Sequence, residues 1–547
     1  MVSLLSSLNM TANSLSVNEK AISVVSHNVA NMNTEGYHKQ RVNLVTRNIA
    51  GAIGDSVYNQ ANANGGVKIA NIMRYNDEYL NNYYRDQLSE KSLLEQQLGN
   101  LDELADIFND LEGTGIDAAL SDFYESLNNL HEYPASSTAR TNFIERAKTL
   151  VSTLNTKSIQ LGELTNTALG DGITPESLEN SKIYSQYREL NNSLEELASV
   201  NKALQTTQTG TLTANNLLDK RDLILNDIAK FIDIKIEENP NGSVNVSTGG
   251  VDLVKGAKVV GSFDIQTASQ FCGNQDPVLI YPDDWVEIDK DGNVIAKEKA
   301  VISIINPEDP ENPVVENAND IIQGGALGGL LHSGTDNGDG VTNAGTVLNT
   351  LNKLTEAVAN IFNTYNTRKG AYCIDAGNTT KLKDSADNNY LFGTYDKDGN
   401  FVNTGITAGN IVLNPELLTK DGIWNIACAY FKDEDYVELD AVGNAQNVSA
   451  MLNTRNEKQN DLNGMSVEDY YTSLLGKIAS AGDSTQTLYD TQCDVVDSVL
   501  AQMDSSYGVD LNEELVDLVK YQTAYSDAAQ VFNACNSCLD VLISLGG

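Results

Sequence analysis

Apolar residues recur every seven positions at both ends of this 547-residue chain. Near the N-terminus the row consists of Leu8, Leu15, Ile22 and Val29. A seven-residue repeat forms a stripe along one side of an α-helix, and two such stripes can pack as a coiled coil. No Pro or Gly precedes Gly36. The spacing therefore predicts a helix over residues 3–31, followed by a turn that closes on Gly36.

The C-terminal row is longer and unbroken. It consists of Leu511, Leu518, Tyr525, Phe532 and Leu539. Asp510 can accept hydrogen bonds from the first turn, and Glu513 lies three residues further on, which is typical of a helix start. This pattern predicts a second long helix that runs almost to the end of the chain.

The two ends also differ in charge. Residues 1–48 carry four basic residues against two acidic ones, whereas residues 504–547 carry one Lys against seven carboxylates. Opposite charges on two matching stripes favour pairing of the helices, and the nine row residues are the predicted assembly interface. The alternative is two ordinary amphipathic helices that pack on separate cores.

Between the ends, the period of the pattern changes from helix to strand. Helical spacing dominates from residue 77 to 231, with long helices over 77–112, 138–169 and 174–204. From Ile234 the apolar residues alternate, which predicts a hairpin and further strands to about residue 305. We expect a multidomain α+β protein with terminal helices paired as a coiled coil, a long-helix bundle domain, and β-rich outer domains inserted in the middle of the chain. The expected domains are 1–48 with 504–547 (terminal helical assembly), 49–234 with 345–370 and 466–503 (helical), 235–344 (β-rich), and 371–465 (second mixed β-rich insert).

Composition excludes several functions. The chain has 36 Lys and Arg against 75 Asp and Glu, a net charge of −39. We expect no nucleic-acid partner, because phosphate contacts need a basic surface. We also expect no binding to an anionic membrane surface. No apolar run is long enough to span a bilayer. The first 20 residues lack the features of a cleavable signal peptide.

Catalytic and metal motifs are also lacking. The pair Cys535-x-x-Cys538 has no second pair to complete a zinc site, and we interpret both residues as small hydrophobes rather than redox thiols. The stretches DKDGN at 289–293 and 396–400 have Gly at the wrong position for a calcium loop, so we predict hairpin turns there. We expect no enzyme activity, no metal and no cofactor.

Both termini resemble a known family. The segment SHNVANMNTEGY at 26–37, with its flanks over 4–44, is similar to the N-terminal signature of bacterial flagellar axial proteins, and residues 507–545 resemble their C-terminal signature. Interior segments over 117–140, 215–256 and 324–337, followed by NNYLFGT at 388–394, are similar to the hook-associated protein 1 family of the hook–filament junction.

The resemblance implies a structural protein, exported by the flagellar type III apparatus and assembled outside the cell as a ring of copies in the flagellum. It implies the hook protein on one side, the next hook-associated junction protein on the other, and an export chaperone at the C-terminal helix. Two alternatives remain. The chain could be another axial protein such as the hook protein, or a surface thiol protein or enzyme on an axial scaffold.

Overall fold

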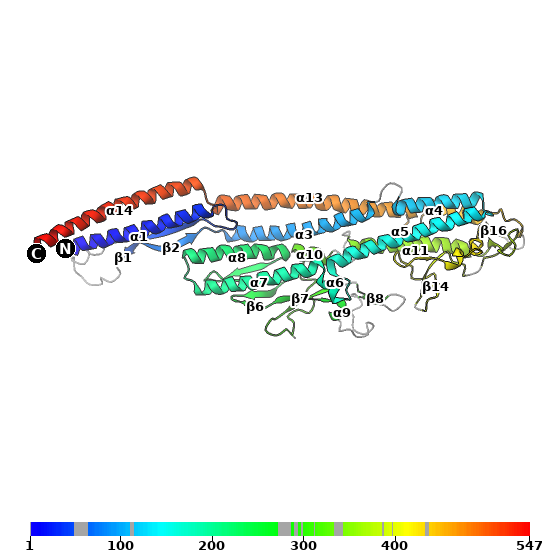
Figure 1. Cartoon of the computed structure of the whole chain (residues 1–547), viewed down its shortest axis with the longest axis horizontal. Helices are drawn as coiled ribbons and strands as arrows, with labels where there is room; N and C mark the ends of the chain where they lie inside the picture. The colour runs from blue at the N-terminus through cyan, green and yellow to red at the C-terminus, as the bar shows by residue number, and fades with distance from the viewer. Residues whose placement is uncertain are drawn as a thin grey trace.

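The protein is an elongated rod with both chain ends at one tip (Figure 1). The computed structural model describes residues 2–48, 64–109, 114–271, 286–288, 294–296, 299–310, 312–332, 343–385, 388–396, 398–432 and 437–546. Long helices run along the rod, and small sheets lie against them. This arrangement confirms the predicted α+β class with helical ends and β-rich inserts.

The terminal part consists of two helices and a hairpin. Helices α1 (Val2–Asn31) and α14 (Leu511–Gly546) lie side by side, as the spacing predicted. Strands β1 (Gln40–Asn48) and β2 (Asn64–Arg74) pair antiparallel, with a register shift between Asn43 and Leu44. The sequence had assigned no strand to this region, and the hairpin packs against α1.

Two long helices connect the terminal part to the rest. Helix α3 (Glu78–Phe108) begins at Asp77, whose side chain accepts a hydrogen bond from the backbone N–H of Leu80. It runs beside α13 (Val467–Tyr507), which is one uninterrupted helix of 41 residues. In Figure 1, α13 runs along the upper edge of the rod and α3 lies directly below it.

A middle core joins helices to sheets. Fully buried Leu190, Leu194 and Leu197 pack in one cluster with Val246 and Leu253. The helices are α7 (Lys182–Thr206), α8 (Leu212–Phe231) and α10 (Gly325–Leu331). The strands are β3 (Lys235–Glu238), β4 (Val244–Thr248), β5 (Val251–Lys255) and β6 (Lys258–Val259) in one sheet, and β7 (Ser262–Thr267) with β10 (Ala300–Ile305) in another.

An outer core fills the end of the rod away from the termini. Its centre is a cluster of aromatic rings from Phe123, Phe143, Phe362 and Phe392. The helices are α4 (Gly115–Glu132), α5 (Ser137–Leu169), α11 (Ala344–Thr367), α12 (Gln446–Asn453) and the first turns of α13. The strands are β11 (Ala371–Ile374), β12 (Leu382–Asp384), β13 (Phe392–Tyr395), β14 (Phe401–Val402), β15 (Val412–Leu413) and β16 (Ala429–Tyr430). Short 3-10 helices lie at Pro415–Leu418, Gly422–Asn425, Thr454–Asn456 and Asn460–Leu462.

One of the predicted helices is wrong, because the structure forms two helices there instead of one. The segment 174–204 forms two helices, α6 (Pro175–Glu179) and α7, with a break at Asn180 and Ser181. The Ser181 side chain accepts a hydrogen bond from the backbone N–H of Tyr184, so it starts a new helix instead of continuing the old one.

The interpretation of DKDGN as a turn is confirmed at the second site. The Asp396 carboxylate accepts hydrogen bonds from the backbone N–H groups of Asp398 and Asn400, and the flanking strands β13 and β14 pair antiparallel. At the first site the flanking strands β8 (Val286–Ile288) and β9 (Val294–Ala296) also pair antiparallel, and the turn itself lies outside the described residues.

The proposed domain limits stay a prediction, since helical and β-rich segments share both large cores.

Candidate assembly interface

The predicted row on α1 lies at the edge of its buried face. Leu8, Leu15, Ile22 and Val29 are all half-buried. The residues buried most deeply occupy the adjoining face, and they are Thr11, Val17, Asn18, Ala21, Val24, Val25 and Asn28. Side chains of the predicted row are therefore partly open to contact with another chain.

The row on α14 changes its exposure along the helix. Leu511 and Tyr525 are each 40% exposed, whereas Leu518, Phe532 and Leu539 are half-buried. A straight α-helix has 3.6 residues per turn, so a strict seven-residue row rotates by about 20° per repeat. The row therefore does not keep one fixed orientation along the helix, and all five members stay at least partly accessible.

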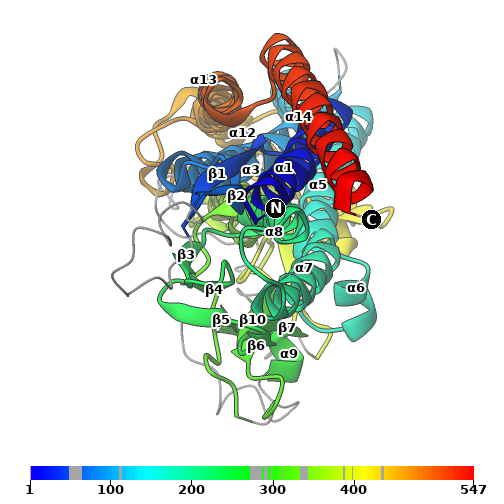
Figure 2. The same ribbon diagram turned by 90° about the vertical axis from the view of Figure 1, so that its left-hand side faces the viewer.

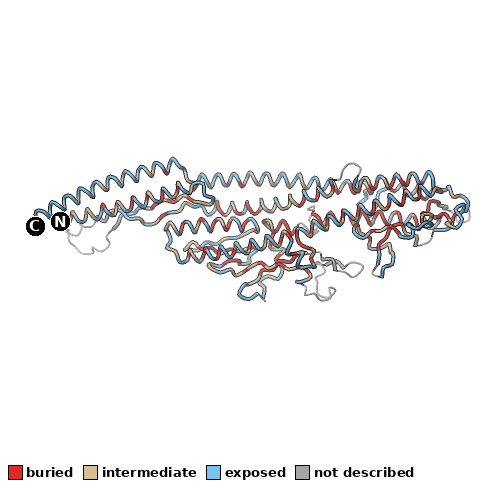
Figure 3. The backbone as a smooth tube through the Cα atoms, in the orientation of Figure 1, coloured by how far each residue is buried: buried red, intermediate tan, exposed pale blue. Residues whose placement is uncertain are grey.

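Much of the surface of α14 is apolar and exposed. Figure 3 shows the helix mainly in the exposed colour, and the end-on view in Figure 2 places it on the outside, away from the sheet strands β3–β7. Its exposed large apolar residues are Leu511, Leu515, Val516, Val519, Tyr525, Val531, Val541, Leu542 and Ile543. Exposed large apolar side chains gathered on one element often mark a contact with another protein.

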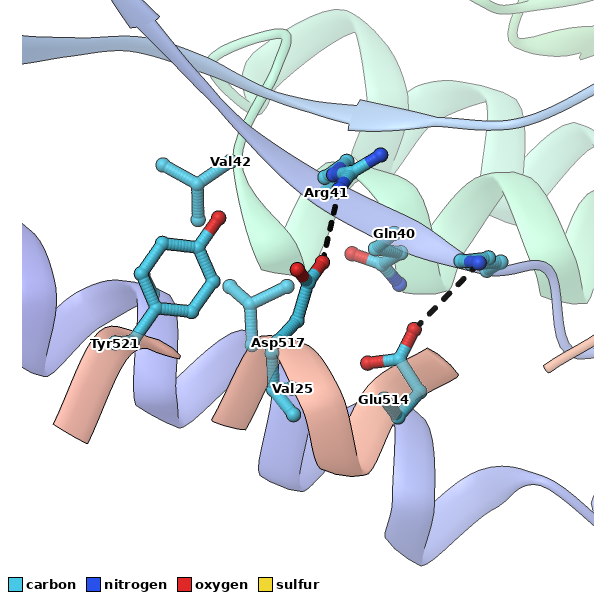
Figure 4. Close-up of a pocket in the computed structure, with 10 residues that line it drawn as sticks. Val25, Gln40, Arg41, Val42, Glu514, Asp517 and Tyr521 are labelled. Atoms are coloured by element: carbon cyan, nitrogen blue, oxygen red, sulfur yellow. Dashed lines mark hydrogen bonds and ion pairs between the residues drawn. The ribbon is translucent and has the colours of Figure 1, made fainter. Parts of the chain in front are cut away.

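Ion pairs connect the first turns of α14 to the segment around β1 (Figure 4). Arg41 Nη2 lies 2.9 Å from the Asp517 carboxylate, and Lys39 pairs with both Glu513 and Glu514. The opposite charges predicted for the two ends do meet. However, the basic residues lie on β1 and just before it, not on the helix α1.

Asn28 is the centre of a polar network inside the N-terminal motif. Its amide nitrogen donates to the Gln40 carbonyl (2.8 Å) and to the Glu514 carboxylate (3.0 Å). Its amide oxygen accepts from the Tyr37 hydroxyl (2.7 Å) and from the Gln40 backbone N–H (3.1 Å). All four hydrogen-bonding positions of the side chain are thus occupied. Burial raises the pKa of Glu514, while Asn28 and Lys39 oppose that shift.

The turn after α1 closes at Gly36, as predicted. Its φ of +72° lies in the left-handed region, which disfavours other residues. An added Cβ would also lie 2.5 Å from the Leu223 side chain on α8. The turn therefore brings the motif close to the middle of the protein.

A buried cluster of ionisable side chains lies where the terminal part meets α3, α8 and β2. We call it the joint, and it consists of His38, Arg74, Arg85, Asp219, Arg221 and Asp222. Each of these side chains is at most 10% exposed. Sequence reasoning missed the joint, because its members are widely separated along the chain and follow no local pattern.

Asp222 is the common partner in the joint. Arg85 lies 3.1 Å and Arg221 2.9 Å from one carboxylate oxygen, and Arg74 binds the other. Burial disfavours the charged form, yet the three guanidiniums hold the pKa of Asp222 well below its usual range. The His38 ring stacks on Tyr507 at 4.6 Å, which ties the joint to the end of α13.

No catalytic or metal-binding arrangement was found among the residues that the structure describes. In these ranges no group of three or more His, Cys, Asp or Glu could hold a metal ion. None of the described helices is long and apolar enough to cross a membrane.

The pair Cys535 and Cys538 is free in the structure, three residues apart on α14. Disulfide geometry is poor at this spacing without unwinding the turn. We expect the double substitution Cys535→Ala and Cys538→Ala to leave folding and motility nearly unchanged, with a small packing loss. Motility assays and thiol mass spectrometry check this. A disulfide in the native protein together with lost motility would contradict it.

Comparisons with known proteins find similarity to flagellar proteins along the whole chain. The family profile described as "Flagellar hook-associated protein FlgK helical domain" matches residues 101–371, and "Flagella basal body rod protein" matches residues 8–38. Curated relatives named "Flagellar hook-associated protein 1" include one from Bacillus subtilis, 23% identical over 100% of this chain and 99% of the relative. The Salmonella typhimurium relative is also 23% identical, over 98% of this chain and 99% of its own length.

A solved structure shows the same fold. The flagellar hook junction protein FlgK from Burkholderia pseudomallei superposes with a TM-score of 0.56 at 12% identity, covering 78% of this chain and 100% of that one. The match of the helical-domain profile and the end-to-end similarity of the relatives favour hook-associated protein 1 over the hook protein. The chain belongs to the flagellar hook-associated protein 1 family.

Proposed function

We propose that this structural protein forms a ring of copies between hook and filament, with the terminal helices as the inner wall and the two large cores outside. The rod shape supports this arrangement, because both ends of the chain lie together at one tip (Figure 1). The resemblance of both termini to axial proteins supports it independently.

The observation that carries the proposal is the uncovered apolar surface of α14. Nine large apolar side chains are exposed there, and Glu514 is the most deeply buried residue that the helix contributes. Burial of apolar area contributes about 25 cal/mol per Å², so neighbouring copies that cover this surface would stabilise the assembly substantially. The half-buried residues of the row on α1 would extend the same contact.

The partners follow from this role. The ring would contact the hook protein on one side. On its other side it would contact the next hook-associated protein. Before assembly, an export chaperone would cover the apolar surface of α14. Export by the flagellar type III apparatus would then deliver the chain to the growing flagellum outside the cell.

A gene deletion tests the function. We expect cells with hooks but without filaments, and flagellin shed into the medium. Complementation with the intact gene should restore filaments, while a gene that lacks residues 511–547 should not. Normal filaments on the deletion strain would contradict the proposal.

Limited proteolysis tests the state before assembly. We expect residues 1 to about 45 and about 505 to 547 to be cut first in the monomer, because α14 buries few side chains and local opening is easiest where few apolar contacts exist. The middle of the chain should survive as a resistant fragment. Termini as resistant as the middle would contradict this expectation.

A further inference from the structure

The hairpin of β1 and β2 has one face on α1 and one face that is open. Val42 and Ile72 lie opposite each other in the ladder and are buried in a cluster with Ala21 of α1. Side chains alternate between the two faces of a strand, so the adjacent pair, Arg41 and Met73, belongs to the other face. We call this second face the outer face of the hairpin.

Exposed apolar and basic side chains occupy the outer face. Val45 lies opposite Lys68, and the register shift after Asn43 adds one residue to β2, which keeps this pair on the same face as Met73. Met73 is 44% and Val45 37% exposed, and Lys68 is exposed as well. The two strands together carry four basic residues and no acidic one. Such a face fits an acidic partner that also exposes apolar side chains.

Helix α14 exposes a surface of this complementary kind. At about 100° per residue, Val516, Val519 and Asp527 lie on the side roughly opposite the buried Glu514, and all three are exposed. The helix carries five acidic residues and one Lys. We call the side with these three residues the outward side of α14.

The hairpin and α14 touch within one chain and then diverge. Arg41 pairs with Asp517 at the first turns of α14. Towards the chain ends, the hairpin runs along one side of α1 and α14 along the other (Figures 1 and 2). Complementary surfaces on two sides of one chain can meet between copies that follow one another in the same sense. Such a head-to-tail contact closes into a ring when the rotation between copies divides a full turn.

We propose that the outer face of the hairpin in one copy binds the outward side of α14 in the next copy. Lys68 faces Asp527 of the neighbouring copy, and Val45 and Met73 pack against the exposed valines of its α14. This inference rests on the ring proposed above and names the two surfaces that build it. Because every copy offers both surfaces, one kind of contact repeats around the whole ring.

Cysteine cross-linking in isolated flagella tests the contact. The full chain carries Val45→Cys and Thr523→Cys, in a background with Cys535→Ala and Cys538→Ala. Thr523 is exposed on the outward side of α14, one turn before Asp527. A bismaleimide should join each copy to the next and give a ladder of covalent multimers on a denaturing gel. A link within one chain adds no such bands.

The matched control places the first cysteine elsewhere, as Val314→Cys with Thr523→Cys. Val314 is also an exposed valine, but it lies beside β10 in the middle of the chain, so this variant should give no ladder. Absence of the ladder from the variant with Val45→Cys, or an equal ladder from the control, would overturn the inference.

Charge reversal gives a second measurement. Lys68→Asp and Asp527→Lys should each lower the number of filaments per cell about tenfold or more, because like charges then face each other at every copy. The two changes together should restore the filaments. Both residues are exposed, so circular dichroism should show normal folding. A double variant as defective as the single ones would overturn this contact, while hooks without filaments in the deletion strain would still support the proposed ring.

Discussion

Replacing Asp222 with Ala is expected to lower the free energy of unfolding by about 3–5 kcal/mol, because it leaves buried guanidiniums without their counter-ion. Three arginines converge on this carboxylate, and each of their side chains is at most 6% exposed. Since the joint connects the terminal part to α3 and α8, the terminal part should also come loose. Chemical denaturation with hydrogen exchange at α1 measures both effects.

The matched control is Asp227→Ala on the same helix. Asp227 pairs with Lys230 at the surface, where an ion pair contributes about 1 kcal/mol or less. The depressed pKa of Asp222 gives a second check. Its stabilisation is present above the ordinary Asp value of 3.8 and is lost as the pH falls through the lower folded value. Equal effects of the two substitutions would refute the importance of the joint.

Replacing Phe532 with Asp is expected to abolish filament attachment while the rest of the protein folds normally. Phe532 belongs to the predicted row on α14, and its side chain is only half-buried in the single chain. A carboxylate there would lose its hydration when the surface is covered by neighbouring copies, at a cost of several kcal/mol per contact. Motility and electron microscopy of complemented cells measure the loss, and circular dichroism with thermal melting checks folding.

Gln530→Asp is the control for the charge itself. Gln530 is exposed on the same helix only two residues away, so the substitution adds the same charge on a different face. This variant should assemble and swim. A motile Phe532→Asp strain would show that the row does not form the assembly contact.

The sequence predicted the long helices well, because each has a regular stripe and recognisable ends. It predicted α1 and α14 to within a few residues, including the start of α14 at Asp510, whose side chain accepts from the backbone N–H of Asn512. The deepest contacts of α1 were missed, because polar Thr11, Asn18 and Asn28 occupy its buried face. A spacing argument that follows apolar residues alone selects the neighbouring stripe.

Structure that depends on distant partners was not predictable. The strands β1 and β2 pair across a long connection, and both pack against α1. The joint unites residue 38 with residues near 74, 85 and 220, and no local rule links those positions.

The uninterrupted helix α13 links the outer core directly to the terminal part. At 1.5 Å per residue its 41 residues span about 60 Å, from the outer core to the contact between His38 and Tyr507. Torque applied to the outer end passes along one hydrogen-bonded helix, which resists twisting better than a chain of loops. Only Gly508, Val509 and Asp510 separate α13 from α14, so such a load passes directly to the terminal part.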